Sequence, residues 1–154
     1  MLLDRPFLRR LFHLGSLASR GMTLGVRGVA LDAQGRVALD RHTYLSGWHL
    51  PGGGVERGET AVGAMEREFR EEAEIVPEAP LRLHGLYRNA AAAPRDHVAV
   101  FVLPAFAVLR PKTPDREIAA CGFFSADALP EGTTRATRAR LREIRDGLPP
   151  DPIW

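Results

Sequence analysis

The sequence lacks several features that would place it in a specialised class of protein. Its single cysteine, Cys121, excludes an internal disulfide bond and favours a reducing compartment, so we expect a cytoplasmic protein. No apolar run approaches the roughly 20 residues that a membrane-spanning helix needs, and we therefore expect no membrane span. Repeats and low-complexity segments are also missing. With 154 residues, 45% of them hydrophobic, the chain is long enough for a single domain over residues 1–154 with a buried core.

Lysine is almost absent, because Lys112 is the only one among 21 basic residues. The formal net charge of +2 conceals a segregation: eight of the 19 acidic residues lie between Glu56 and Glu78, while both ends of the chain are rich in arginine. A basic surround near an acidic site suits a polyphosphate substrate. A genome that favours arginine codons would explain the scarcity of lysine equally well.

Residues 5–20 contain four arginines and no acidic residue. Their apolar side chains recur at helical spacing and form a wide apolar face, which predicts an amphipathic helix. We expect this helix to pack on the domain or on a second subunit, and the second arrangement would make a homodimer. The alternative is a basic helix on a membrane surface, or a targeting presequence.

The rest of the chain alternates between predicted strands and turns. Strands are predicted at 22–32, 36–40, 81–88 and 98–109. A final helix is predicted from about Thr133 to Asp146, and Gly147 ends it. Its five arginines favour a solvated face over a contact with RNA.

The most informative segment is residues 53–75, in which a glycine-rich turn leads into an acidic helix. Thr60 can cap a helix that runs to Ala73. An apolar stripe recurs at helical spacing along it, formed by Val62, Met65, Phe69 and Ala73. Glu68 and Glu72 project about 40° apart, with Glu71 on the same flank, so all three should sit at the rim of the stripe.

Three carboxylates held this close repel one another, and one would take up a proton unless a cation compensates. Oxygen ligands suit Mg²⁺ or Mn²⁺, which makes Glu68, Glu71 and Glu72 candidate metal ligands. The alternative is a solvated acidic face paired with Arg67 and Arg70.

The segment matches a known pattern. Six residues fall at the spacing G-x5-E-x7-R-E-x-x-E-E: Gly53, Glu59, Arg67, Glu68, Glu71 and Glu72. This spacing resembles the Nudix box, the signature of enzymes that split pyrophosphate linkages, usually in nucleoside diphosphate derivatives. The resemblance implies an α/β fold in which a mixed β-sheet is sandwiched between helices. It also implies a small-molecule nucleotide substrate.

The resemblance assigns roles to individual residues. It implies that Glu68, Glu71, Glu72 and the Gly52 carbonyl hold the metal, and that Gly53 belongs to the loop beside it. A salt bridge between Glu59 and Arg67 would tie this loop to the helix. The implied catalytic set is Arg67, Glu71, Glu72 and Glu117, with Glu71 or Glu117 as the general base. The alternative for Glu117 is an exposed loop residue with no role in the site.

One position departs from the family pattern, which normally has Gly where this chain has Glu74. Either Glu74 adopts a left-handed conformation, which costs on the order of 1 kcal/mol, or the helix continues toward Val76. No carboxylate of the metal set is missing, so this departure predicts no loss of activity.

Two further features bear on ligands. Arg27 interrupts an apolar strand, and it faces either solvent or a cleft where its guanidinium would bind phosphate. His42 and His49 have no partners at a zinc spacing, so we predict that neither binds metal.

Three functions remain open. The first is an Mg²⁺-dependent hydrolase of nucleoside diphosphate-linked compounds or nucleoside triphosphates. The second is an RNA 5′-end pyrophosphohydrolase, which the basic segment 135–145 favours, although no aromatic stacking platform supports it. The third is a non-catalytic nucleotide-binding module, against which the intact acidic residues argue.

Overall fold

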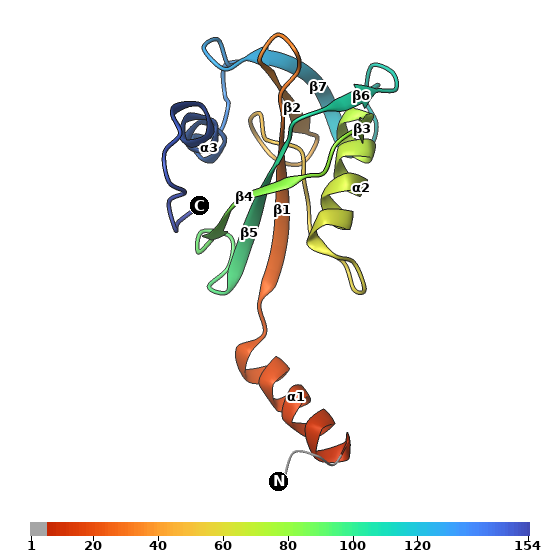
Figure 1. The fold of residues 1–154 in the computed structure, drawn as a ribbon, viewed down its shortest axis with the longest axis vertical. Helices are drawn as coiled ribbons and strands as arrows, with labels where there is room; N and C mark the ends of the chain where they lie inside the picture. Colours follow the sequence, from red (N-terminus) through yellow and green to blue (C-terminus); the bar gives the residue numbers. More distant parts are fainter. Residues whose placement is uncertain (1–5) are drawn as a thin grey trace.

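The structure is a computed structural model that describes residues 6–154 (Figure 1). It contains the helices α1 (Pro6–Arg20), α2 (Ala61–Ala73) and α3 (Arg135–Asp146). The strands are β1 (Thr23–Ala30), β2 (Arg36–His42), β3 (Ile75–Pro77), β4 (Arg82–Arg88), β5 (Asp96–Leu103), β6 (Phe106–Val108) and β7 (Ile118–Ser125). Within the described part of the chain, no helix is both long enough and apolar enough to cross a membrane.

The strands form mixed sheets with helices beside them, as predicted. The central sheet has the order β1-β5-β4, in which β5 runs parallel to β1 and antiparallel to β4. Two antiparallel pairs, β2-β7 and β3-β6, complete the strands. The strand predicted at 98–109 is divided into β5 and β6 at Pro104, which has no N–H to donate to a ladder.

Alternation along the strands builds one hydrophobic core on each side of the central sheet. On β5, Ala99 and Phe101 pack in the cluster that contains α2, whereas Val98 and Val100 pack in the cluster that contains Leu141 of α3. Successive side chains of a strand point to opposite faces, so a run of apolar residues serves both layers. Figure 1 shows α2 and α3 on opposite sides of the strands, as a sandwich requires.

Helix α2 begins and ends as the sequence predicts. The Thr60 side chain accepts a hydrogen bond from the Gly63 N–H, and Glu74 ends the helix in the left-handed region with φ 54°. The chain then enters β3, so the alternative of a helix that continues toward Val76 is wrong. Val62 is also not part of the buried stripe, because it is 41% exposed.

Helix α1 matches the predicted range, and Arg5 lies outside the described residues. It extends away from the strands (Figure 1), and the side chains of Leu11, Phe12, Leu14 and Leu17 are each more than half exposed. The prediction that its apolar face packs on the domain is therefore wrong for these four side chains. Packing on a second subunit stays a prediction.

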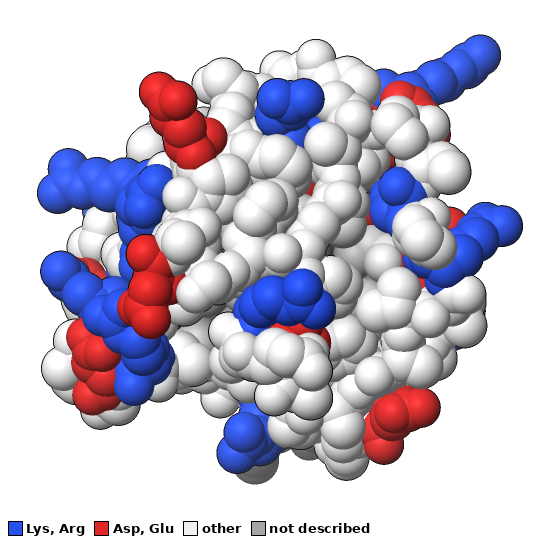
Figure 2. Space-filling model, turned by 90° about the horizontal axis from the view of Figure 1, so that it is seen from above, with Lys and Arg blue, Asp and Glu red and all other residues white. Residues whose placement is uncertain are grey.

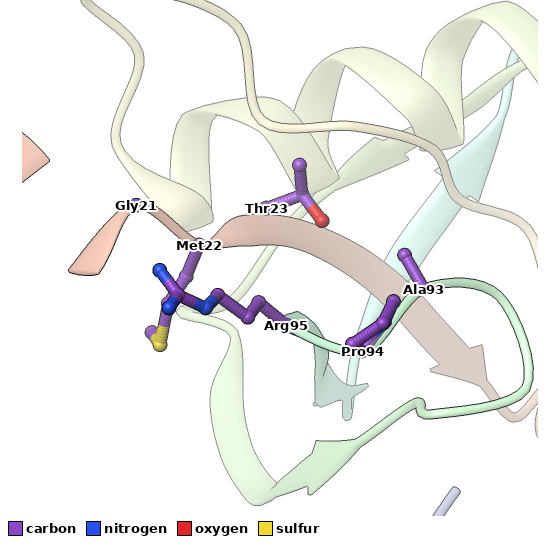
Figure 3. Close-up of a pocket in the computed structure, with 6 residues that line it drawn as sticks. All are labelled: Gly21, Met22, Thr23, Ala93, Pro94 and Arg95. Carbon is purple, nitrogen blue, oxygen red and sulfur yellow. The ribbon is translucent and has the colours of Figure 1, made fainter. Parts of the chain in front are cut away.

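A hollow of about 530 Å³ lies where α1 meets β1. Arg95 donates a hydrogen bond to the Ser19 carbonyl at 2.6 Å, and its side chain extends toward Met22 (Figure 3). The hollow is lined by Gly21, Met22, Thr23, Ala93, Pro94 and Arg95. No carboxylate lines it, so the acidic residues of the candidate site lie elsewhere.

Candidate active site

The loop that precedes α2 is fastened along β1 by backbone hydrogen bonds. The N–H of Val26 donates to the Gly53 carbonyl, and the N–H of Gly28 donates to the Pro51 carbonyl, both at 2.8 Å. Gly52 lies between them with φ 150°, and a Cβ there would lie 2.0 Å from the Val26 carbonyl oxygen. Only glycine therefore fits this position, and the loop is held close to the strand.

Two of the three candidate metal ligands are buried, which corrects the prediction that all three sit at a rim. Glu68 is 8% exposed and Glu72 is 5% exposed, whereas the Glu71 side chain is 60% exposed. The Glu72 Oε2 atom accepts a hydrogen bond from the Gly52 N–H at 2.6 Å. Burial raises the pKa of Glu68, and burial together with the nearby Asp40 carboxylate raises the pKa of Glu72 well above that of an ordinary carboxyl group.

Arg67 connects the loop to the acidic flank of α2. Its Nε and Nη2 atoms donate to the two carboxylate oxygens of Glu59 at 2.8 and 3.1 Å. Its Nη1 atom donates to Glu68 at 2.7 Å and to Glu71 at 3.2 Å, and Nη2 also reaches the Gly54 carbonyl at 3.1 Å. The hydrogen bonds from Arg67 lower the pKa of Glu59 to about 2. The salt bridge that the family resemblance implied is thus one of several contacts that Arg67 makes with the loop and with α2.

A cavity of about 500 Å³ lies beside the end of α2. The Glu117 N–H donates to Asp115 Oδ1 at 2.9 Å, and the Glu117 carbonyl accepts from the Thr43 N–H at 2.8 Å. Lys112 Nζ donates to the Glu71 carbonyl at 2.6 Å and forms an ion pair with Asp115. The cavity is lined by Glu71, Glu72, Asp115, Arg116, Glu117 and Ile118. The structure therefore brings Glu117 together with two glutamates of α2.

Arg27 does not line this cavity. Its Nη1 atom donates to the Leu50 carbonyl at 2.9 Å, and it lines a smaller hollow of about 280 Å³ together with Gly53 and Gly54. The side chain is half-buried rather than fully solvated. Arg27 thus lies beside the glycine loop, with one nitrogen already occupied by the backbone of that loop.

The sequence model of the NUDIX domain matches residues 21–144 of the chain. The chain belongs to the Nudix family. The matched range contains the glycine loop, α2 and Glu117, and it begins directly after α1.

Solved structures share the Nudix fold of this protein. The MutT NUDIX hydrolase from Burkholderia pseudomallei is 28% identical, with a TM-score of 0.65 over 81% of this chain and 99% of that one. An ADP-ribose pyrophosphatase from Streptococcus suis is 24% identical, with a TM-score of 0.61 over 80% of this chain and 91% of that one. At that identity the second likeness concerns the fold alone.

Curated relatives align over a shorter segment. The RNA pyrophosphohydrolase of Xylella fastidiosa is 42% identical over 50 residues, and that of Xanthomonas oryzae pv. oryzae is 44% identical over 52 residues. These segments cover 32% and 33% of this Nudix protein. The match spans only about a quarter of the length of these relatives, 26% and 25%.

The basic helix α3 is less available to a ligand than its sequence indicates. Arg140 is 3% exposed, forms a 2.7 Å ion pair with Glu143 and lies over the Tyr87 ring at 4.2 Å from its centroid. Arg145 pairs with Asp146 at 2.7 Å. The face seen in Figure 2 carries both basic and acidic side chains with uncharged surface between them, and its described residues form no continuous basic patch. The prediction that the arginines of this helix form a solvated face is therefore wrong at Arg140.

Two buried residues beside α2, which we call the Nudix helix, were missed by sequence reasoning. Asp40 and His42, from the end of β2, lie next to Glu72. His42 was discounted because no partner stands at a zinc spacing, but that reason fails, since its neighbours come from two different elements. The one available signal was Asp40 itself, a charge placed directly after the apolar residues 37–39.

Proposed function

We propose that this Nudix protein is an Mg²⁺- or Mn²⁺-dependent hydrolase of pyrophosphate bonds in nucleoside diphosphate-linked compounds or nucleoside triphosphates. One observation carries the proposal: Glu71, Glu72 and Glu117 line one cavity, and Glu72 also accepts a hydrogen bond from the backbone of the glycine loop. That arrangement gathers acidic oxygens from two parts of the chain at one place.

The donor set fits a hard divalent cation. Carboxylate oxygens and a backbone carbonyl are the ligands that such ions prefer, so Glu68, Glu71, Glu72 and the Gly52 carbonyl would hold it. The raised pKa of Glu72 supports this fit, because burial and a neighbouring carboxylate destabilise its anion until a cation compensates. When bound, the ion neutralises charge on the pyrophosphate oxygens and makes a water molecule easier to deprotonate.

The remaining work falls to side chains of this chain. Glu71 or Glu117 accepts the proton of the attacking water, since both line the cavity and the backbone of Glu117 is held by Asp115 and Thr43. Arg67 orients Glu68 and the loop rather than reacting itself. The rate enhancement then comes mainly from positioning and charge complementarity.

A substrate panel with and without divalent metal tests the proposal. With Mg²⁺ or Mn²⁺, we expect the protein to release mononucleotide or phosphate from one or more nucleoside diphosphate derivatives or triphosphates. EDTA should abolish turnover, and zinc should not be required. Full turnover in metal-free buffer would contradict the proposed role of the glutamates. A thermal shift with nucleotides but no product would instead identify a binding module.

A second candidate substrate is the 5′ end of RNA, because the curated relatives are named RNA pyrophosphohydrolases. Burial and the ion pair with Glu143 remove Arg140 from a possible RNA contact, and the curated relatives match only about a third of this chain, so we place this candidate second. Pyrophosphate release from a 5′-triphosphate RNA, measured in the same panel, separates the two.

Arg27 is proposed to bind the phosphate that the metal does not hold. Arg27→Lys keeps the charge but loses the planar fork, so KM should rise for the substrate that the panel identifies. Arg27→Ala should raise KM further, by the factor that corresponds to roughly 1.5–3 kcal/mol of binding free energy lost with the charged hydrogen bonds. The Mg²⁺ dependence should scarcely change. Arg36→Lys, an exposed arginine of β2, serves as the matched control. Wild-type KM in both Arg27 variants would show that phosphate recognition does not involve this residue.

A further inference from the structure

Three buried side chains converge directly behind the Nudix helix. His42 Nε2 lies 3.2 Å from Asp40 Oδ1 and 3.5 Å from Glu72 Oε1. The ligand atoms of the three residues all lie within 4.8 Å of one another. Asp40 and His42 come from the end of β2 and Glu72 from the last turn of α2, so only the tertiary fold assembles the cluster.

The polar atoms that Asp40 and His42 bring to this cluster are unsatisfied. Both carboxylate oxygens of Asp40 and both ring nitrogens of His42 are buried with no hydrogen-bond partner among the residues that the structure describes. Asp40 is completely buried and His42 is 5% exposed, so bulk water does not compensate them. A buried polar group left this way costs about 1–3 kcal/mol, and more when it is charged. A ligand that binds both the Asp40 carboxylate and the His42 imidazole would remove this cost.

We propose that Asp40, His42 and Glu72 bind one divalent transition-metal ion of the first row. Two ligands that each lie about 2.1 Å from one ion are about 3.0 Å apart in octahedral geometry and about 3.4 Å apart in tetrahedral geometry. The observed separations of 3.2 and 3.5 Å match this spacing. Two carboxylates and a neutral imidazole also carry the charge that a divalent ion neutralises.

The imidazole distinguishes this inner site from the metal set of the box. Imidazole nitrogen suits ions such as Zn²⁺, Fe²⁺ and Co²⁺, whereas Mg²⁺ prefers oxygen ligands and keeps several waters. Glu72 belongs to both sets, and it is the member of the cluster that also lines the cavity beside the end of α2. Asp40 and His42 belong only to the inner site, so the inference does not depend on the proposed hydrolase activity.

Wild-type protein in excess Mg²⁺ provides the first test. Titration with Co²⁺, followed by its visible ligand-field absorption, should show saturation at one ion per chain. With Mn²⁺ as the probe, electron spin echo measurements should detect coupling to a ¹⁴N nucleus. The box residues offer only oxygen, so nitrogen coupling reports an imidazole ligand and needs no mutant.

Variants then assign the ligands. Asp40→Asn and His42→Ala should each weaken Co²⁺ binding by more than roughly 100-fold. Removing a residue that only hydrogen-bonds to a metal ligand typically weakens binding by about 10- to 100-fold. Far-UV circular dichroism checks that both variants fold. His49→Ala is the matched control, since its ring lies 5.8 Å from that of His42 but outside the cluster. Glu68→Gln should lose hydrolysis and retain Co²⁺.

The outcomes are distinguishable. Stoichiometric Co²⁺ binding that His42→Ala abolishes, together with ¹⁴N coupling in the wild type, supports the inner site. Wild-type protein that binds no Co²⁺ in excess Mg²⁺, or binds Mn²⁺ without ¹⁴N coupling, overturns it even if the variants fail to fold. Wild-type protein that binds Co²⁺ in this way but hydrolyses no nucleotide of the substrate panel would count against the proposed function alone.

Discussion

The Glu72→Gln variant should lose nearly all hydrolytic activity and yet be at least as stable as the wild type without metal. Glutamine keeps the shape and can still accept the hydrogen bond from the Gly52 N–H. Its amide can also donate to Asp40, whose buried oxygens have no donor among the described residues. The charge that a cation needs is gone, so kcat should fall by roughly 10³ or more, since one lost charge-stabilising contact alone costs about 10²–10³.

The stability half of this prediction has a definite sign. The pKa of Glu72 is raised in the folded protein, so the folded state binds this proton more tightly than the unfolded state. The metal-free wild type should therefore lose stability as the pH rises above the usual carboxyl pKa of 4.5, and Glu72→Gln should remove that loss. Thermal unfolding in EDTA at several pH values measures it.

Glu66→Gln is the matched control, because Glu66 is an exposed residue of the same helix. It should leave both kcat and the melting temperature unchanged. Near-native kcat in Glu72→Gln and Glu68→Gln would show that the acidic cluster is a structural feature and not a metal site. If kcat falls only about tenfold in Glu68→Gln, Glu68 does not contact the metal and instead positions the residues that do.

The parts of this fold that sequence reasoning reached are those that local chemistry decides. Thr60 caps α2 because a hydroxyl oxygen can accept the free N–H groups of a first turn, and this needs no distant partner. Most of β5 lies within the strand predicted at 98–109, because the apolar run there is buried by two layers. The spacing of the Nudix box identifies each of its residues by position in the sequence. The residues that Arg67 contacts within the box could therefore be named before the contacts themselves were known.

The parts that it did not reach depend on contacts between distant segments. Val62 has the right spacing for the buried stripe, but no other element covers it. Asp40 and His42 face Glu72 only because β2 packs beside α2. The apolar face of α1 is wide enough to predict a packing partner, but the pattern alone does not say which surface covers it. Periodicity gives the direction of a side chain within its element and not its neighbour.

The Arg67→Ala variant should lower stability and metal affinity together. Arg67 is the shared donor for Glu59, Glu68 and the Gly54 carbonyl, so its loss leaves a buried carboxylate unpaired and releases the loop. The Arg67 side chain is 27% exposed, so we scale the effect to charged hydrogen bonds, about 2–3 kcal/mol, rather than to a fully buried ion pair. For a chain of this length, the melting temperature should fall by roughly 5–10 °C.

Arg70→Ala provides the control, since Arg70 is an exposed arginine one turn further along the same helix. It should change the free energy of unfolding by less than about 0.5 kcal/mol, as surface substitutions usually do, and the melting temperature should therefore scarcely move. For Arg67→Ala, the Mg²⁺ concentration that gives half-maximal activity should rise, because the loop that carries Gly52 is no longer held against α2. An unchanged melting temperature with lost activity would instead make Arg67 a direct contact to the substrate, and its hydrogen bonds to Glu59 would then be secondary to that role.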